Sequence, residues 1–254
     1  MVLLETASPP EGFRGRVWLA AWRQERPGPS ANEGFVHTRH YGASRISRGH
    51  RRNGLAMEKP APVEHPIHEL LARRWSPRAI DPSRPLTAEE IDRLLEAARW
   101  APSSFNEQPW RYLVFDGSDP AALQAARDCL VEGNRWARLA PVLMLSVASD
   151  RFSHNDRPNR TAQHDVGLAS ENLVLQAVAM GLAAHQMSGF SVQRAREAFN
   201  IAEGYTPLAM IAIGHHGRIE DLPEDKREAE TAPRTRKALS EIAYWGAWDA
   251  RRQR

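Results

Sequence analysis

The sequence predicts an α+β fold, a single domain in which a central sheet is packed between helices. Segments with helical spacing of apolar residues alternate with short apolar segments of strand length. Capping residues, prolines and glycines mark where these segments begin and end. The composition, 42% hydrophobic and 26% charged over 254 residues, is typical of a soluble globular protein. The longest apolar run, residues 139–148, is about half as long as a segment that crosses a bilayer.

The first predicted helix has a clear beginning and end. Thr87 and Glu90 form a capping box, and Pro102 ends the helical pattern. Between them an apolar face repeats at helical spacing and consists of Ile91, Leu94, Leu95, Ala98 and Trp100.

The other predicted helices are bounded by similar residues. Asp119 caps a helix that has Pro120 at its first position, and Gly181 ends the longest helix. These helices cover residues 119–131, residues 161–180, a short stretch after Ser191 and a terminal stretch from about Thr235.

Strands are predicted where short apolar runs lie between the helices. One run has the continuous apolar character of a strand that is buried on both faces. The predicted strands are Arg111–Phe115, Leu139–Ala148, Ala183–Gln186 and Leu208–Ile213.

Residues 1–56 differ in composition from the rest of the chain, and we expect them to be a disordered, arginine-rich extension. They carry nine arginines and four glutamates, and the glutamates argue against a transit peptide. Because the composition changes at Met57, we hypothesise that translation starts there, and that residues 57–254 form the functional domain. The whole chain has a net charge of +3 and residues 1–56 have +5, so the remaining 198 residues have −2. That balance argues against nucleic-acid binding by the folded part.

The chain has a single cysteine, Cys129, so it can form no internal disulfide and no cysteine-based zinc site. A reducing, cytoplasmic location is therefore expected. The histidines lack the spacing of a metal site on one helix face, and no metal is predicted. They are interpreted as surface or core residues and are His164, His185, His215 and His216.

The segment Arg74-Trp75-Ser76-Pro77-Arg78 has the residue types of a phosphate site. Proline favours an extended conformation for Ser76, and an extended chain places alternate side chains on one side. Arg74, Ser76 and Arg78 can therefore project together. Guanidinium groups form forked, charge-assisted hydrogen bonds with phosphate oxygens. The alternative is a solvated basic turn, since arginines are usually exposed.

A second polar cluster follows the first helix, in the stretch Pro102-Ser103-Ser104-Phe105-Asn106-Glu107-Gln108-Pro109-Trp110. Its two amides, at positions 106 and 108, can each donate and accept a hydrogen bond, as the edge of a heterocycle requires. The alternative is a loop in which Ser and Asn side chains bond to their own backbone.

Together these stretches resemble the nitroreductase family of FMN-dependent oxidoreductases. The resemblance extends over residues 66–245 and includes two further motifs. The motifs are Asp165-Val166-Gly167-Leu168-Ala169-Ser170-Glu171-Asn172-Leu173 and Ile213-Gly214 followed by Pro233-Arg234-Thr235-Arg236. Two departures are the tryptophan at position 75 and the loose spacing between Gly214 and Arg234. The resemblance implies a mostly antiparallel sheet flanked by helices, in a twofold dimer with flavins at the interface.

The resemblance also implies roles for particular residues. Contacts with the phosphate, the ribityl chain and the N1/O2 side of FMN fall to Arg74, Ser76 and Arg78, with Arg234 or Arg236 completing the phosphate clamp. Ser103, Ser104 and Asn106 of the partner subunit would contact the flavin ring. The amide of Asn134 would also contact the ring. A backbone N–H of the Ser188-Gly189 loop would face flavin N5.

The activity implied is transfer of hydride from NADH or NADPH, through FMN, to a small electrophilic acceptor by a ping-pong mechanism. Nitroaromatics, quinones and unsaturated carbonyls are the expected acceptors. We name no catalytic side chain, because the hydride chemistry belongs to the flavin. The alternative function is a flavin reservoir or sensor without turnover. A third, nucleic-acid binding through the arginine-rich extension, conflicts with the charge of the folded part.

Overall fold

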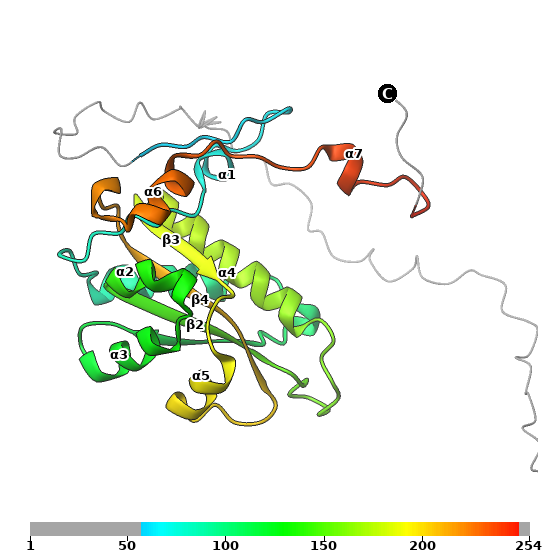
Figure 1. The fold of residues 1–254 in the computed structure, drawn as a ribbon. Coiled ribbons are helices and arrows are strands. Elements are labelled where there is room, and N and C mark those ends of the chain that lie inside the picture. The colour runs from blue at the N-terminus through cyan, green and yellow to red at the C-terminus, as the bar shows by residue number, and fades with distance from the viewer. Residues whose placement is uncertain (1–56, 249–254) are drawn as a thin grey trace, which may run out of the picture. The chain divides into compact units, whose positions relative to one another are not determined.

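The structure, a computed structural model, describes residues 57–248. The predictions for residues 1–56, including the translation-start hypothesis, lie outside the described residues. Four antiparallel strands form one sheet in the order β1-β2-β4-β3 (Figure 1). The strands are β1 (Trp110–Phe115), β2 (Val142–Ser149), β3 (Leu182–Met187) and β4 (Tyr205–His215). The predicted α+β fold, with an antiparallel sheet between helices, is confirmed.

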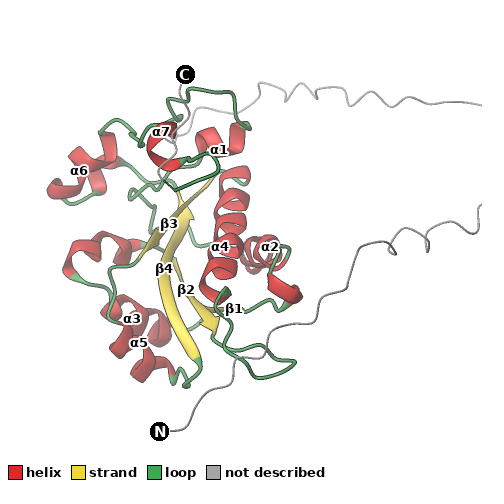
Figure 2. Cartoon of the chain, turned by 90° about the vertical axis from the view of Figure 1, so that its right-hand side faces the viewer, coloured by secondary structure: helices red, strands yellow, loops and turns green. Residues whose placement is uncertain are grey.

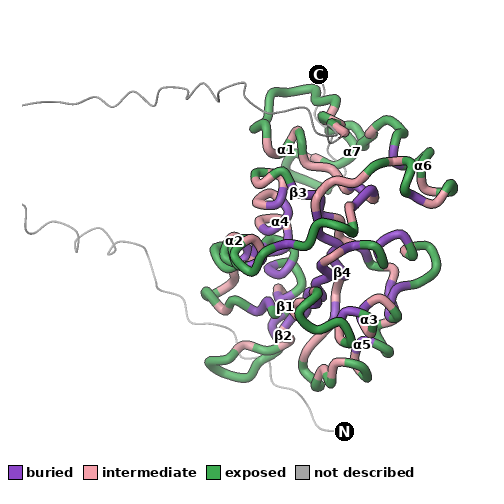
Figure 3. Tube along the Cα trace, turned by 90° about the vertical axis from the view of Figure 1, so that its left-hand side faces the viewer, coloured by how far each residue is buried: buried purple, intermediate pink, exposed green. Residues whose placement is uncertain are grey.

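Each face of the sheet is covered by its own pair of helices (Figure 2). One face packs against α2 (Ala88–Arg99) and α4 (Ala162–Ala179), and the other against α3 (Pro120–Cys129) and α5 (Val192–Phe199). The two central strands are buried on both sides, as the purple tube in Figure 3 shows.

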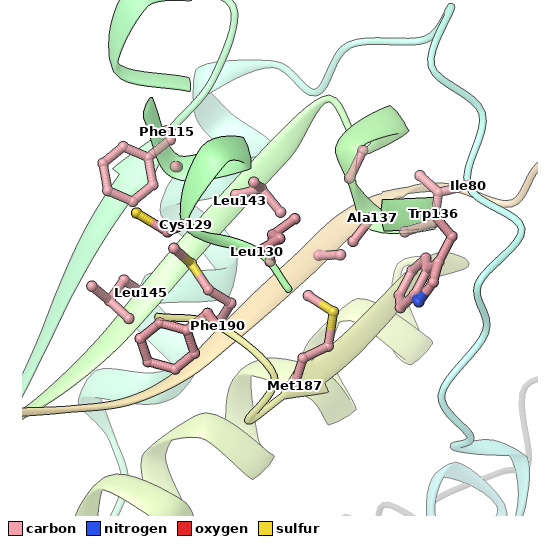
Figure 4. Close-up of a cluster of buried hydrophobic side chains, with 14 of the residues drawn as sticks. Ile80, Phe115, Cys129, Leu130, Trp136, Ala137, Leu143, Leu145, Met187 and Phe190 are labelled. Carbon is pink, nitrogen blue, oxygen red and sulfur yellow. The ribbon is translucent and has the colours of Figure 1, made fainter. Parts of the chain in front are cut away.

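The pleat of β2 sorts its side chains between two buried cores, because successive side chains point to opposite faces. Leu143 and Leu145 contribute to the core under α3 and α5, while Val142 and Met144 contribute to the core under α4. The first of these cores is drawn in Figure 4 and extends from Phe115 to Trp136 and Ile80.

The predicted helix ends agree closely with those observed. Thr87 and Glu90 form the capping box of α2, and the Asp119 side chain accepts the Ala122 N–H at 3.0 Å to cap α3. Gly181 follows α4 with a φ of 73°, a left-handed conformation that glycine adopts without strain. Among residues 57–248, no helix has the length and apolar character needed to cross a membrane.

Two predictions about the helices were wrong, and two short helices were missed. The terminal helix expected from Thr235 is only the four-residue α7 (Leu239–Ile242). Trp100, placed on the apolar face of the first helix, is 73% exposed and donates to Glu96 at 2.7 Å. The missed helices are α1 (Glu69–Arg73) and α6 (Glu224–Thr231). Both lie on the side of the molecule where strand β3 begins (Figure 1).

Candidate functional site

The extended segment after α1 lines one cleft together with the segment after α6. The cleft has a volume of about 250 Å³. Five residues to which the resemblance gave a role in cofactor binding line it: Arg74, Ser76, Arg78, Arg234 and Arg236. The structure thus brings together side chains that are more than 150 positions apart in the sequence.

Arg74 stands between a hydroxyl and a carboxylate. One of its terminal nitrogens donates to Ser76 Oγ at 3.3 Å, and its Nε lies 3.6 Å from Glu171 Oε1 on α4. Burial raises the pKa of Glu171, and the positive charge of Arg74 opposes that shift. Since the ion pair is long and Glu171 is partly exposed, the guanidinium keeps donors for an anion.

Glu230 is a residue at this cleft that the sequence reasoning missed. Its side chain is buried, and Oε1 accepts the main-chain N–H groups of Arg78 at 2.8 Å and Ala79 at 3.0 Å. Oε2 lies 3.6 Å from the Arg78 guanidinium. The carboxylate is therefore occupied in holding the extended segment in place. No sequence pattern marks it, because α6 is polar on nearly every side.

The two C-terminal arginines have different surroundings. Arg234 donates from one terminal nitrogen to two main-chain oxygens, those of Lys59 at 2.6 Å and Ala72 at 2.8 Å. Burial lowers the pKa of Arg234, as do the positive charges of Arg74 and Arg236. Arg236 is exposed and bonds only to the main-chain oxygen of Thr235 within the described chain. Arg234 thus braces the cleft, while Arg236 has donors to spare.

A second group of predicted residues lies beyond the end of β3. Asn134 Nδ2 donates to Gly189 O at 3.0 Å, and the Val131 N–H donates to the same oxygen at 3.2 Å. A Cβ on Gly189 would lie 2.5 Å from Asn134 Nδ2, so this close approach requires glycine. Ser188 is exposed beside it. The structure therefore brings Asn134, Ser188 and Gly189 together.

His185 connects the cleft with this second group. Its Nδ1 lies 3.1 Å from the carbonyl oxygen of Pro77, and its ring centroid is 4.7 Å from that of Trp136. Burial lowers the pKa of His185 to about 4, against the raising effect of the Pro77 hydrogen bond. The imidazole is therefore neutral at pH 7, with Nδ1 as donor. Trp136 lies two positions after Asn134, in the core drawn in Figure 4.

The third predicted group, Ser103, Ser104 and Asn106, does not line the cleft of its own chain. Ser104 N donates to Asp165 Oδ2 at 3.1 Å, which anchors the loop to the start of α4. Ser103 Oγ accepts the Gln108 N–H at 2.9 Å, so this hydroxyl bonds to the main chain of its own loop. Asn106 has a φ of 55°.

The other reactive side chains form no further site. Within residues 57–248, no group of three or more His, Cys, Asp and Glu side chains could hold a metal ion. Cys129 is buried on α3, its thiol donates to Ala125 O at 3.3 Å, and burial raises its pKa. A buried, protonated thiol is a poor nucleophile.

Comparison with known proteins identifies similar chains. The family model described as the nitroreductase family matches residues 71–215. The oxygen-insensitive NAD(P)H nitroreductase of Salmonella typhimurium is 30% identical over 65% of this chain and 97% of its own. Protein DrgA of Synechocystis is 32% identical over 63% of this chain and 87% of its own. A solved structure, an oxidoreductase containing FMN, is 33% identical, with a TM-score of 0.70 over 78% of this chain and 100% of its own.

Proposed function

Since this chain belongs to the nitroreductase family of oxidoreductases, we propose that it uses FMN to carry hydride from NADH or NADPH to a small electrophilic acceptor. Nitroaromatics, quinones and unsaturated carbonyls are the acceptor classes. The proposed location is cytoplasmic. Bound FMN would supply the hydride chemistry. Because both substrates would use one open face of the cofactor in turn, the kinetics would be ping-pong.

The observation that carries the proposal is the convergence of Arg74, Ser76, Arg78, Arg234 and Arg236 on one cleft. The carboxylates of Glu230 and Glu171 lie 3.6 Å from Arg78 and Arg74, but four arginines line the cleft, so an excess of positive charge remains. A phosphate monoester fits this donor set, since guanidinium groups and a hydroxyl are its usual partners. We assign the cleft to the phosphate of FMN.

The ring end of the cofactor is assigned to the group beyond β3. The amide of Asn134 would face the pyrimidine edge, and the backbone N–H of the Ser188-Gly189 loop would face N5. The His185–Pro77 hydrogen bond supports this arrangement, because it fixes the cleft segment against the strand that leads into the loop. A cation such as Arg78 near N1 and O2 would stabilise negative charge on the reduced ring.

The proposed active form is a homodimer in which Ser103, Ser104 and Asn106 reach the cofactor of the partner subunit. Two features of the single chain support it. The loop carries Phe105, which is 83% exposed, and it is anchored to α4 through Asp165. Beside Asp165, α4 presents an exposed strip that includes Gly167 and Leu168. Sedimentation of the purified protein tests this state, and a monomer with full activity would contradict it.

Anaerobic mixing with NADPH or NADH tests the activity. The FMN-loaded protein should lose its flavin absorbance and regain it when a nitroaromatic or quinone is added. An unchanged spectrum with both nicotinamides would favour the alternative, a flavin reservoir or sensor. Arg74→Ala should weaken FMN binding by about ten- to a hundredfold, the effect of one charge-assisted hydrogen bond. If Arg74→Ala binds FMN as tightly as the wild type, the cleft does not hold the phosphate.

A further inference from the structure

The cleft contains one cation that lies outside every motif discussed above. Lys59 lines it beside Trp75, Ser76 and Arg78, although it precedes the extended segment by more than a dozen positions. It also lies outside the family match, which begins at residue 71.

The ammonium group of Lys59 is held from two sides. Nζ donates to the main-chain oxygen of Glu230 at 2.7 Å and lies 4.7 Å from the centroid of the Trp75 ring. An ammonium group has three donors, and the contact with Glu230 uses one of them. The cation–π contact fixes the side chain without using a further donor.

The main chain of Lys59 is held as well. Its carbonyl oxygen accepts from Arg234 at 2.6 Å, and two positions later the Ala61 N–H donates to Ala72 O at 2.8 Å. The same guanidinium of Arg234 bonds to Ala72 O, so one side chain ties the segment at Lys59 to the end of α1. Arg234 thus positions Lys59 at the cleft.

The electrostatics of the cleft favour an anion next to this lysine. Burial lowers the pKa of Lys59, and the positive charges of Arg78 and Arg234 lower it further, while Glu230 opposes the shift. The positive charges of neighbouring cations repel one another. A phosphate that binds among them offsets this repulsion and stabilises the charged form of each.

We infer that Lys59 is a further phosphate ligand of the bound flavin nucleotide, held at the cleft by Trp75, the Glu230 main chain and Arg234. This inference rests on the proposed function, which places FMN in the cleft. It gives the N-terminal segment before α1 a binding role and gives Arg234 a positioning role.

Binding of FMN and riboflavin, compared by quenching of flavin fluorescence, tests the inference, because riboflavin lacks the phosphate. The full-length protein should prefer FMN by about a hundredfold or more. Lys59→Gln keeps a donor for Glu230 O but removes the charge, and should weaken FMN binding by about ten- to a hundredfold while leaving riboflavin binding unchanged. Lys59→Arg should restore most of the FMN affinity.

Lys226→Gln is the matched control, since Lys226 pairs with Asp225 on α6 and does not line the cleft. It should bind both flavins as the wild type does. Equal losses for FMN and riboflavin in Lys59→Gln would show a purely structural role and overturn the inference, as would an FMN affinity within twofold of the wild type. In either case the wild type still prefers FMN, and the proposed function stands. A wild type with no preference for FMN would overturn both.

Discussion

The carboxylate of Glu230 accepts the main-chain N–H of Arg78 at 2.8 Å and so joins helix α6 to the segment that supplies the first arginines of the cleft. The bond links residues 152 positions apart. Because the Glu230 carboxylate is buried, water competes little for it, and the bond determines where the extended segment lies.

Replacing Glu230 with glutamine should therefore destabilise the fold. The glutamine oxygen could accept the two N–H groups that bond to Oε1, but the amide nitrogen would replace Oε2 and would face the Arg78 N–H and guanidinium, which are donors. We expect the free energy of unfolding to fall by about 2 to 3 kcal/mol, measured by urea denaturation. Glu228→Gln, an exposed position on the same helix, is the control and should change the value by less than about 0.5 kcal/mol. Equal stabilities of the two variants would contradict the buried role of Glu230.

The buried imidazole of His185 should make stability depend on pH. Its pKa is about 4 in the folded chain and 6.5 ordinarily, so between these values the unfolded chain takes up a proton that the folded chain does not. The free energy of unfolding should therefore fall as the pH is lowered from 6.5 to 4, by about 3 kcal/mol in total.

His185→Asn retains a donor for Pro77 O and removes the titration. Subtracting its pH profile from that of the wild type isolates His185 from His216, whose pKa burial also lowers. Parallel profiles for the two proteins over this range would show that His185 titrates normally.

Gly189 should be required for binding the flavin ring. In Gly189→Ala the new methyl group would lie 2.5 Å from Asn134 Nδ2 and would displace that amide from its bond with the carbonyl oxygen at position 189. We expect binding of riboflavin and FMN to weaken by the same factor, about tenfold. Gly117→Ala, where a methyl group meets nothing within 4 Å, is the control. Normal riboflavin binding by Gly189→Ala would remove this loop from the site.

Asn106 should contact the ring across the dimer interface. Asn106→Gly removes the amide and also relieves the left-handed conformation, so the variant isolates the side chain. FMN and riboflavin should each bind about two- to tenfold more weakly, as expected for one neutral hydrogen bond. Asn155→Gly, in an exposed turn, should leave both affinities unchanged. A loss confined to FMN would place Asn106 at the phosphate instead.

The elements predicted from the sequence are those with strong local signals. The capping box at Thr87, the proline after Asp119 and the glycine after α4 mark helix ends through contacts within a few residues. Helix α6 has no such signal, because seven of its eight residues are not buried and it has no apolar period. The tail beyond Thr235 has apolar residues at helical spacing, yet its helix is only four residues long, since spacing alone does not supply a surface to pack on.

The residues of the candidate site also differ in whether a local sequence signal marks them. Arg74, Ser76 and Arg78 could be grouped from the sequence because proline and strand geometry act locally. The roles of Arg234 and Asn134 came from resemblance. Glu230 and Lys59 could not be predicted from the sequence, because no local pattern marks a single acid on a polar helix or a single lysine. Their roles depend on contacts with residues far along the chain.

The brace between Arg234 and Lys59 spans 175 positions, so one wall of the cleft comes from near the beginning of the described chain and another from near its end. A nascent chain that still lacks Glu230 and Arg234 contains Arg74 and Arg78 but lacks the contacts that hold their segment in place. We therefore expect FMN to be captured only after the C-terminal part has been synthesised, and truncation before Glu230 should yield a colourless protein.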